Sequence, residues 1–336
     1  MPSDTRMTEG PSPPRPIAIL GFGRSGTTWV SDIVSTCLGG LILFEPMFPT
    51  ALESASAYCY ADVSETDSRR TLEQHFNAIL AEENHAPWLL RNHVKHPLDQ
   101  VDPAFLDRIW AECRIVGFKE IRANFMIDQL AGDWGYRTLF VLRHPCAVIS
   151  SPKGRPWFWK GDFDSFEIHL VMFDERVLKN PKYAEPFSGI DTKRIIETGS
   201  QIEKEALIWA ATHKVALAAL ARTGTPLLYY EDLFADPFSY SRELLEAVTG
   251  DASRLLHPAY IFTPSMVTLK TSHDLYFADN SIHEAGPSFF WKERLTEADV
   301  SSIEAVVSLF DLHLCDALGK PDPRGIDDVR VLHAKK

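Results

Sequence analysis

Short apolar runs alternate with longer stretches of helical periodicity along most of this chain. Continuous apolar runs of this length are typical of strands that are buried on both faces; they cover residues 17–20, 41–44, 114–118, 137–142 and 226–230. Apolar side chains recur with helical spacing over residues 27–37, 71–83, 103–112, 121–130, 203–221, 239–248 and 296–310, and a further helix should begin near Pro145. Alternation of strands and helices predicts an α/β fold, with a mainly parallel central sheet flanked by helices.

The pattern indicates one domain rather than two. Residues 1–15 are rich in proline, serine and charge, and are expected to form a disordered tail. The domain is expected to cover residues 16–320, followed by a C-terminal tail over residues 321–336. Residues 152–200 are the least regular part and are rich in aromatic side chains. A long connection of this kind predicts a lid or insertion that binds an acceptor molecule.

The first apolar run ends in a glycine-rich loop that leads into a predicted helix. Residues 21–29 read GFGRSGTTW. A loop of this kind gathers backbone N–H groups at the positive end of the helix dipole, where phosphate or a similar anion binds. The candidate anion-binding residues are Gly23, Arg24, Ser25, Gly26, Thr27, Thr28 and Trp29.

Three interpretations of this loop compete. Its glycines fit the G-x-G-x-x-G dinucleotide fingerprint, and Glu45 follows about 20 residues later, where a ribose-binding carboxylate is expected. Gly21 and Gly26 also have the P-loop spacing, but Thr27 stands where a P-loop has its lysine. The third interpretation comes from a resemblance: residues 24–29, RSGTTW, resemble the loop with which sulfotransferases hold 3′-phosphoadenosine 5′-phosphosulfate (PAPS).

A second motif favours the third interpretation. Arg143 ends the apolar run 137–142, and Ser151 follows eight residues later. Ligands of open α/β sheets bind beyond the carboxyl ends of the strands, and the planar guanidinium of arginine suits phosphate. In composition and spacing this pair resembles the motif that holds the 3′-phosphate of PAPS in sulfotransferases. A dinucleotide-dependent dehydrogenase has no use for it.

The resemblance to PAPS-dependent sulfotransferases extends over most of residues 16–310. FEP at residues 44–46 is similar to an element of carbohydrate sulfotransferases, and KEIR at 119–122 to one of carbohydrate and protein-tyrosine members. YEDL at 230–233 is similar to a stretch that follows a core strand in many members, and WKERL at 291–295 to a C-terminal element. The resemblance implies a single α/β domain related to P-loop kinases. It also implies transfer of a sulfuryl group from PAPS to a hydroxyl, without a metal, on a carbohydrate or another small molecule.

The resemblance also implies catalytic roles. Arg24 and Lys119 are the expected cations, which stabilise negative charge on the leaving phosphate oxygen. Arginine does not give up its proton at neutral pH, so Arg24 acts electrostatically. Glu45 lies at the separation from Arg24 at which protein-tyrosine members place their basic glutamate, and is the candidate general base. His96, in a context similar to the histidine base of cytosolic members, is the rival candidate.

The remaining nucleotide contacts follow the same resemblance. Trp29 matches a tryptophan that covers adenine, although a buried helix position would explain it equally well. Tyr230 is a further candidate for the adenine. Cytosolic members hold the 3′-phosphate with an additional R-K-G triplet near the C-terminus, where this chain has Ile-His-Glu-Ala-Gly at residues 282–286. Either Lys292 or Arg294 supplies the missing charge, or the 3′-phosphate is held more loosely.

Composition narrows the alternatives. A formal net charge of −12 argues against a sizeable nucleic-acid-binding surface, so an anionic nucleotide must be attracted by a local basic pocket. The five cysteines have no C-x-x-C spacing, which predicts reduced thiols and no zinc site. No apolar segment resembles a secretory signal or reaches the length of a membrane span, so a cytoplasmic enzyme is expected. An NAD(P)-dependent oxidoreductase and a non-catalytic nucleotide binder remain the alternative functions.

Overall fold

A computed structural model of the chain describes most of the predicted domain. The described residues are 15–48, 51–52, 58–60, 66–81, 85–91, 93, 101–151, 166–183, 185–255, 291–315, 320–322, 326 and 328–334. Predictions for residues 1–14, for His96 and for residues 152–165 lie outside this set.

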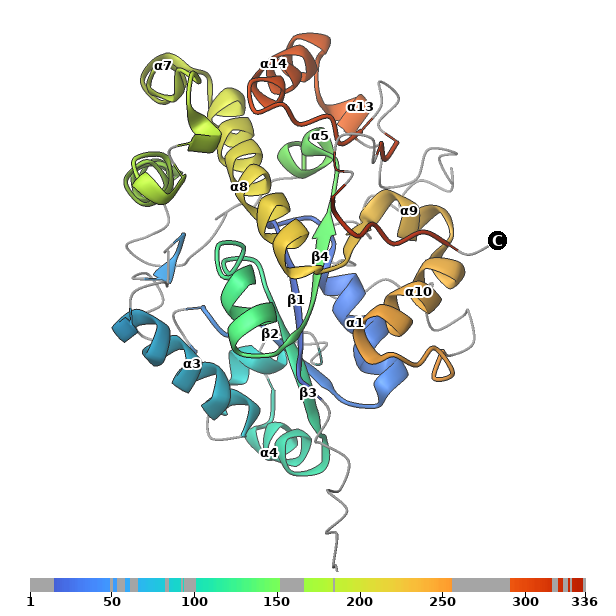
Figure 1. Cartoon of the computed structure of the whole chain (residues 1–336). Coiled ribbons are helices and arrows are strands. Elements are labelled where there is room, and N and C mark those ends of the chain that lie inside the picture. Colours follow the sequence, from blue (N-terminus) through green and yellow to red (C-terminus); the bar gives the residue numbers. More distant parts are fainter. Residues whose placement is uncertain are drawn as a thin grey trace, which may run out of the picture.

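Within the described residues, a five-stranded parallel sheet forms the centre of the molecule (Figure 1). Its order is β2-β3-β1-β4-β5, with bounds β1 Ile17–Gly21, β2 Leu41–Phe44, β3 Ile115–Glu120, β4 Arg137–Leu142 and β5 Leu227–Tyr229. β1 pairs with β3 on one side and with β4 on the other. The α/β class, the parallel sheet and all five predicted strand positions are therefore confirmed, with ends that differ by a residue or two.

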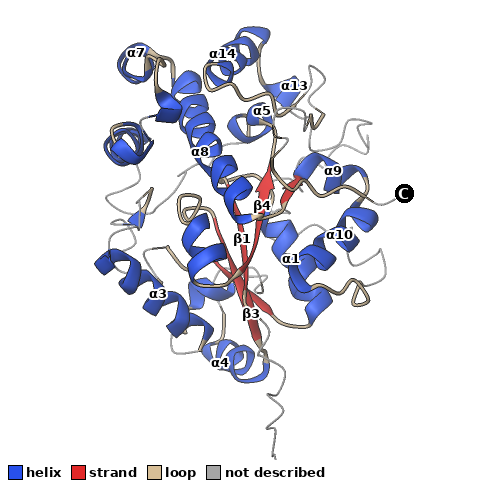
Figure 2. Ribbon diagram, in the orientation of Figure 1, coloured by secondary structure: helices blue, strands red, loops and turns tan. Residues whose placement is uncertain are grey.

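Helices cover both faces of the sheet (Figure 2). The α-helices are α1 Thr27–Leu38, α3 Thr66–Leu80, α4 Pro103–Glu112, α5 Pro145–Ile149, α6 Phe166–Phe173, α7 Thr192–Thr198, α8 Gln201–Thr223, α9 Tyr230–Ala235, α10 Pro237–Thr249, α13 Trp291–Arg294 and α14 Glu297–Ser308. Short helices of other types are η1 Pro87–Leu90, η3 Asp128–Asp133, η4 Asp174–Leu178, η5 Pro181–Tyr183 and η6 Glu185–Phe187.

Alternate residues of β1 belong to two different hydrophobic cores. Ile17 and Ile19 pack with α1, α9 and α10, whereas Ala18 and Leu20 pack with the core that contains α3, α8 and α14. Because strand side chains alternate between faces, a strand that is covered on both sides has to be apolar at every position. This explains why β1 is recognisable in the sequence as an unbroken apolar run.

Helix starts follow the signals in the sequence. α14 begins with a capping box in which the Thr296 hydroxyl accepts the Asp299 N–H and the Asp299 carboxylate accepts the Thr296 N–H. α8 begins in the same way with Ser200 and Glu203. Each box satisfies two backbone donors that the first helical turn leaves open, which fixes where the helix begins.

The predicted helix over residues 121–130 is wrong for its first part. Residues 121–126 form bends and turns, and helical structure begins only at Ile127 and continues as a short π-helix over Asp128–Asp133. The Glu120 carboxylate accepts the N–H groups of Ile121 and Arg122, and the Asn124 side chain donates to the Ile121 carbonyl. These side chains bond to the backbone groups that a helix would use, so the turn replaces the helical start.

Two predicted peripheral segments contact the domain core. The described part of residues 152–200 is a series of short helices, and Phe173, Val177 and Ile195 from it are buried in the same core as α8. At the other end, the Leu227 N–H donates to the Arg330 carbonyl and the Leu332 N–H donates to the Leu227 carbonyl. This part of the expected C-terminal tail is thus hydrogen-bonded to the edge strand β5.

In the described part of the chain, no helix is long and apolar enough to span a bilayer.

The pairing of β3 with β1 leaves no room for a side chain at Gly117. A Cβ there would overlap the backbone of Ile17, which is its partner in the ladder. Gly117→Ala should therefore lower the free energy of unfolding by about 3 kcal/mol, at the upper end of the cost of overpacking. Gly132→Ala is the control, because no described atom outside its chain neighbours and the backbone of its own helix lies within 4 Å of its Cβ position. Urea unfolding checks the pair; equal stabilities would contradict the β1–β3 register.

Candidate functional site

Predicted functional residues lie at the carboxyl end of every strand of the sheet. From one edge to the other these are Glu45 after β2, Lys119 in β3, loop 22–26 after β1, Arg143 after β4, and Tyr230 after β5. Because all five strands are parallel, these ends share one edge of the sheet, where open α/β sheets bind their ligands. Residues that are up to about 200 positions apart in sequence are thus gathered in one region.

The glycine-rich loop is held in a tight turn. The hydroxyl and the N–H of Ser25 both donate to the Phe22 carbonyl, at 2.7 and 3.1 Å, and Ser25 is fully buried. Gly26 has φ of 92°, and a Cβ there would overlap the ring of Tyr230. Arg24 also has positive φ, 71°, which is uncommon for a side chain of this size. Gly26 is therefore required by backbone conformation and by the approach of Tyr230.

Helix α1 begins directly after the loop without a capping side chain. Its N-cap is Gly26, and its first turn holds no acidic residue. The first N–H groups of any helix have no acceptor within it, and they lie at the positive end of its dipole. Thr27 is buried and Thr28 is half-buried at this end. The N-terminus of α1 is thus suited to an anion that accepts from the backbone.

Three residues of the two sequence motifs come together beside the loop. Arg143 Nη1 donates to the Arg24 carbonyl at 3.0 Å, and Arg24 Nε donates to Ser151 Oγ at 2.8 Å. The Arg143 guanidinium also lies 4.4 Å from the centre of the Tyr230 ring, in cation–π geometry. Arg24 is exposed and Arg143 is half-buried. Two arginines and a serine hydroxyl therefore form a basic, hydrogen-bonding cluster at the ends of β1 and β4.

Arg294 adds positive charge to this cluster. The short helix α13 packs next to Arg143, because the rings of His144 and Trp291 stack in parallel with centroids 4.9 Å apart. Burial and the positive charge of Arg143 both lower the pKa of Arg294. Lys292, the other candidate from the sequence, lies with its Nζ 5.3 Å from the centre of the Trp291 ring. The sequence signal for Arg294 was the WKERL stretch, but nothing in it distinguished Arg294 from Lys292.

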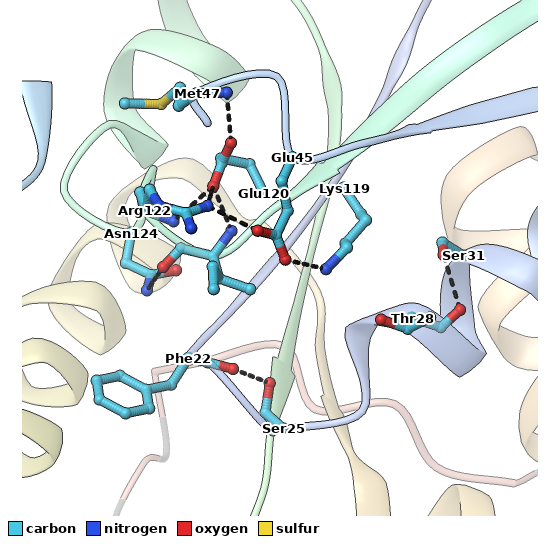
Figure 3. A network of polar contacts seen from close by, with 11 residues as sticks. Phe22, Ser25, Thr28, Ser31, Glu45, Met47, Lys119, Glu120, Arg122 and Asn124 are labelled. Carbon is cyan, nitrogen blue, oxygen red and sulfur yellow. Dashed lines mark hydrogen bonds and ion pairs between the residues drawn. The ribbon is translucent and has the colours of Figure 1, made fainter. Parts of the chain in front are cut away.

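A second cluster lies at the ends of β2 and β3 (Figure 3). The buried Glu45 carboxylate accepts from Lys119 Nζ at 2.5 Å and from Arg122 Nη1 at 2.8 Å. Arg122 Nη1 also lies 3.0 Å from the carboxylate of Glu120, and that carboxylate accepts the Met47 N–H at 2.7 Å. Two acidic and two basic side chains thus neutralise one another within the protein. Arg122, the last residue of the KEIR stretch, links both carboxylates.

Burial and charge act in opposite directions on this second cluster. Burial by itself raises the pKa of Glu45, but the charges of Lys119 and Arg122 outweigh it and lower this pKa to about 2. Burial and the charge of Glu45 raise the pKa of Glu120, although Arg122 opposes them. Burial lowers the pKa of Arg122, but the two carboxylates raise it well above its ordinary value. Glu45 is consequently a carboxylate that is stabilised in its charged form.

The two aromatic candidates for adenine are both buried. Trp29 is 8% exposed and makes edge contacts with Tyr230 and Phe234, within the core between α1 and α9. This favours the interpretation of Trp29 as a core residue of α1. Tyr230 is 7% exposed, with its ring between Gly26 and Arg143. It shapes the loop as well as contacting the basic cluster.

Comparisons of this chain with family models, with curated proteins and with solved structures find no match. In the described part of the chain there is also no group of three or more histidine, cysteine, aspartate or glutamate side chains that could hold a metal ion.

The buried cluster predicts unequal effects of its two cations on stability. Arg122→Met leaves two buried carboxylates beside a single lysine, and breaking a buried pair in this way costs about 3–5 kcal/mol. Lys119→Met should cost less, because Arg122 still compensates both carboxylates. Urea unfolding at pH 7 measures the difference; a larger loss for Lys119→Met would contradict the central position of Arg122.

Acid should weaken the same cluster. The pKa of Glu45 is about 2 in the folded protein and 4.5 for an unperturbed carboxyl. Its contribution to stability is therefore complete above pH 4.5 and is lost as the pH falls towards 2. The stability difference between the wild type and Glu45→Gln should shrink over this interval. A difference that stays constant from pH 5 to pH 2 would show that Glu45 is not held in its charged form.

Proposed function

We propose that this protein is a PAPS-dependent sulfotransferase that acts on a hydroxyl group of a small molecule or a glycan. One observation carries the proposal: the two sequence motifs that resemble donor-binding elements are joined by hydrogen bonds from Arg143 to Arg24 and from Arg24 to Ser151. These residues are separated by more than 100 positions in the sequence. A site that combines a helix N-terminus with a separate basic cluster suits a nucleotide that carries anions at two positions.

The two anions of the donor would be held by different elements. The loop amides, the first turn of α1 and Arg24 would take the 5′-phosphosulfate. Arg143 and Ser151 would take the 3′-phosphate, with Arg294 as an additional cation. Arginine suits this task because its planar fork can donate two parallel hydrogen bonds to phosphate.

The reaction forms a bond between the acceptor oxygen and sulfur and breaks the bond between sulfur and the bridging phosphate oxygen. The electron pair of the broken bond stays on the phosphate, where Arg24 and Lys119 would stabilise the negative charge. The proton of the acceptor hydroxyl would pass to Glu45. A carboxylate that is bound by two cations is a weak base, so Glu45 would act after Lys119 has turned from it towards the phosphate. His96 is the rival base.

The strand order weighs against the dinucleotide-dependent oxidoreductase. In the usual dinucleotide-binding order β2 lies directly beside β1, which brings the carboxylate after β2 to the ribose. Here β3 lies between β1 and β2, and the Glu45 carboxylate is bound to Lys119 and Arg122. The presence of Arg24, Glu45 and Lys119 together weighs against a non-catalytic nucleotide binder, and a turnover assay separates it from the enzyme.

Nucleotide preference tests the basic cluster. The wild type should bind adenosine 3′,5′-bisphosphate more tightly than AMP, and Arg143→Ala should lose roughly ten- to a hundredfold of that affinity, since a hydrogen bond to a charged group contributes about 1.5–3 kcal/mol. Arg137→Ala is the matched control, because Arg137 begins the same strand and donates to the Val248 carbonyl. Calorimetry that gives equal affinities for both nucleotides would contradict a 3′-phosphate site.

Turnover tests the assignment of the base. Glu45→Gln should lower the turnover number by about 10²–10⁴-fold, the usual contribution of general-base catalysis, and leave affinity for the donor nearly unchanged. His96→Ala is the paired variant, and it should retain activity. A loss that is confined to His96→Ala would transfer the role of base to His96.

A further inference from the structure

Glu231 is a buried carboxylate beside the basic cluster that the proposed chemistry does not use. It lies in the first turn of α9, directly after Tyr230, and is 5% exposed. Its Oε1 accepts the backbone N–H of His144 at 3.1 Å. Its Oε2 has no hydrogen-bond partner among the described residues. The carboxylate is thus tied to the residue that follows Arg143, with half of its acceptor capacity unused.

Charged and titratable groups from two neighbouring strands and from α9 itself act on this carboxylate. Arg143 comes from the end of β4, Asp232 is the next residue of α9, and Tyr229 is the last residue of β5. Burial raises the pKa of Glu231 to about 7, and the charge of Asp232 adds to this. Arg143 and the His144 N–H oppose the increase. The positive charge of Arg143 is therefore the main electrostatic influence that keeps Glu231 ionised near neutral pH.

Arg143 is a partner shared by several groups. It donates to the loop carbonyl of Arg24, covers the ring of Tyr230 and interacts with the charge of Glu231. An anion that binds to Arg143 adds negative charge close to Glu231, and a like charge favours the protonated form of a carboxyl group. Conversely, an ionised Glu231 offsets the positive charge that attracts the anion. The two events oppose one another through a single guanidinium.

We propose that Glu231 is a positioning residue whose protonation state sets the affinity of Arg143 for its anion, so that anion binding is accompanied by proton uptake at the Glu231 carboxylate. The inference rests on the proposed function, since it takes the anion to be the 3′-phosphate of a nucleotide. By linkage, affinity for this phosphate falls as the pH rises and Glu231 ionises. A purely structural Glu231 would only accept the His144 N–H, and glutamine can do the same.

Glu231→Gln separates the two roles, because the amide oxygen can still accept the His144 N–H while the titratable charge is removed. Calorimetry between pH 7 and pH 8.5 suits the test, since the phosphates of both nucleotides are fully ionised over most of this range, with a second pKa of about 6. For the wild type we expect the affinity for adenosine 3′,5′-bisphosphate to fall roughly three- to fivefold from pH 7 to pH 8.5. This is the change expected if binding raises the pKa of Glu231 by about one unit. AMP, without a 3′-phosphate, should show little change.

The controls isolate the carboxylate. Glu231→Gln should bind the bisphosphate with the same affinity at pH 7 and pH 8.5. Asp232→Asn removes the neighbouring carboxylate of the same helix, which is hydrogen-bonded to Tyr240. It should keep a pH-dependent affinity, displaced to lower pH because the charge of Asp232 raises the pKa of Glu231. Wild-type titrations in two buffers of different ionisation enthalpy count the protons directly and require no variant to fold.

The outcomes are distinct. Proton uptake by the wild type that disappears in Glu231→Gln supports the linkage. Equal pH dependence in the wild type and Glu231→Gln, or bisphosphate binding by the wild type without proton uptake, overturns the role of Glu231 and leaves the proposed function standing. If the wild type fails to bind the bisphosphate at any pH, the proposed function fails and this inference fails with it.

Discussion

The position of β1 between β3 and β4 determines the geometry of the whole candidate site. Leu20 pairs with Glu120 on one side and with Phe140 on the other, so the three strands reach the same edge in step. The loop after β1 is consequently flanked by the end of β3, which carries Lys119, and by the end of β4, which is followed by Arg143. A change in either register would separate the loop from one of its two cations.

The two polar clusters on either side of the loop differ in how far their charges are compensated. Around Glu45 the charges are buried and neutralise one another, which is the condition under which a protein interior tolerates them. Around Arg143 positive charge accumulates instead, with Arg24 exposed and Arg294 electrostatically coupled to Arg143. A surplus of positive charge in a protein of net charge −12 indicates a local attraction for anions. The compensated cluster stabilises the ends of β2 and β3, and the basic cluster is suited to an anion.

Much of this arrangement was predictable from the sequence because it depends on local signals. β1 is an unbroken apolar run, and α14 starts with a capping box. The hydrogen bond between Arg24 and Ser151 joins two motifs that are recognisable in the sequence. Other features depend on contacts between distant residues. The turn after β3 stands where a helix was predicted because the Glu120 carboxylate accepts neighbouring N–H groups. Arg294 is distinguished from Lys292 as the cation beside Arg143 only by the packing of α13. The burial of Trp29 depends on its contacts with α9. Glu231 lies within the YEDL stretch at residues 230–233, but nothing in that stretch indicated its burial beside Arg143.

A crystal structure of the complex with adenosine 3′,5′-bisphosphate tests most directly whether one nucleotide with two separate anions spans the carboxyl edge of the sheet. The predicted result is a 5′-phosphate that accepts hydrogen bonds from the loop amides and the first turn of α1, with the 3′-phosphate bound to Arg143 and Ser151. A nucleotide bound away from this edge, or one whose 3′-phosphate makes no contact with Arg143, would contradict the proposed function.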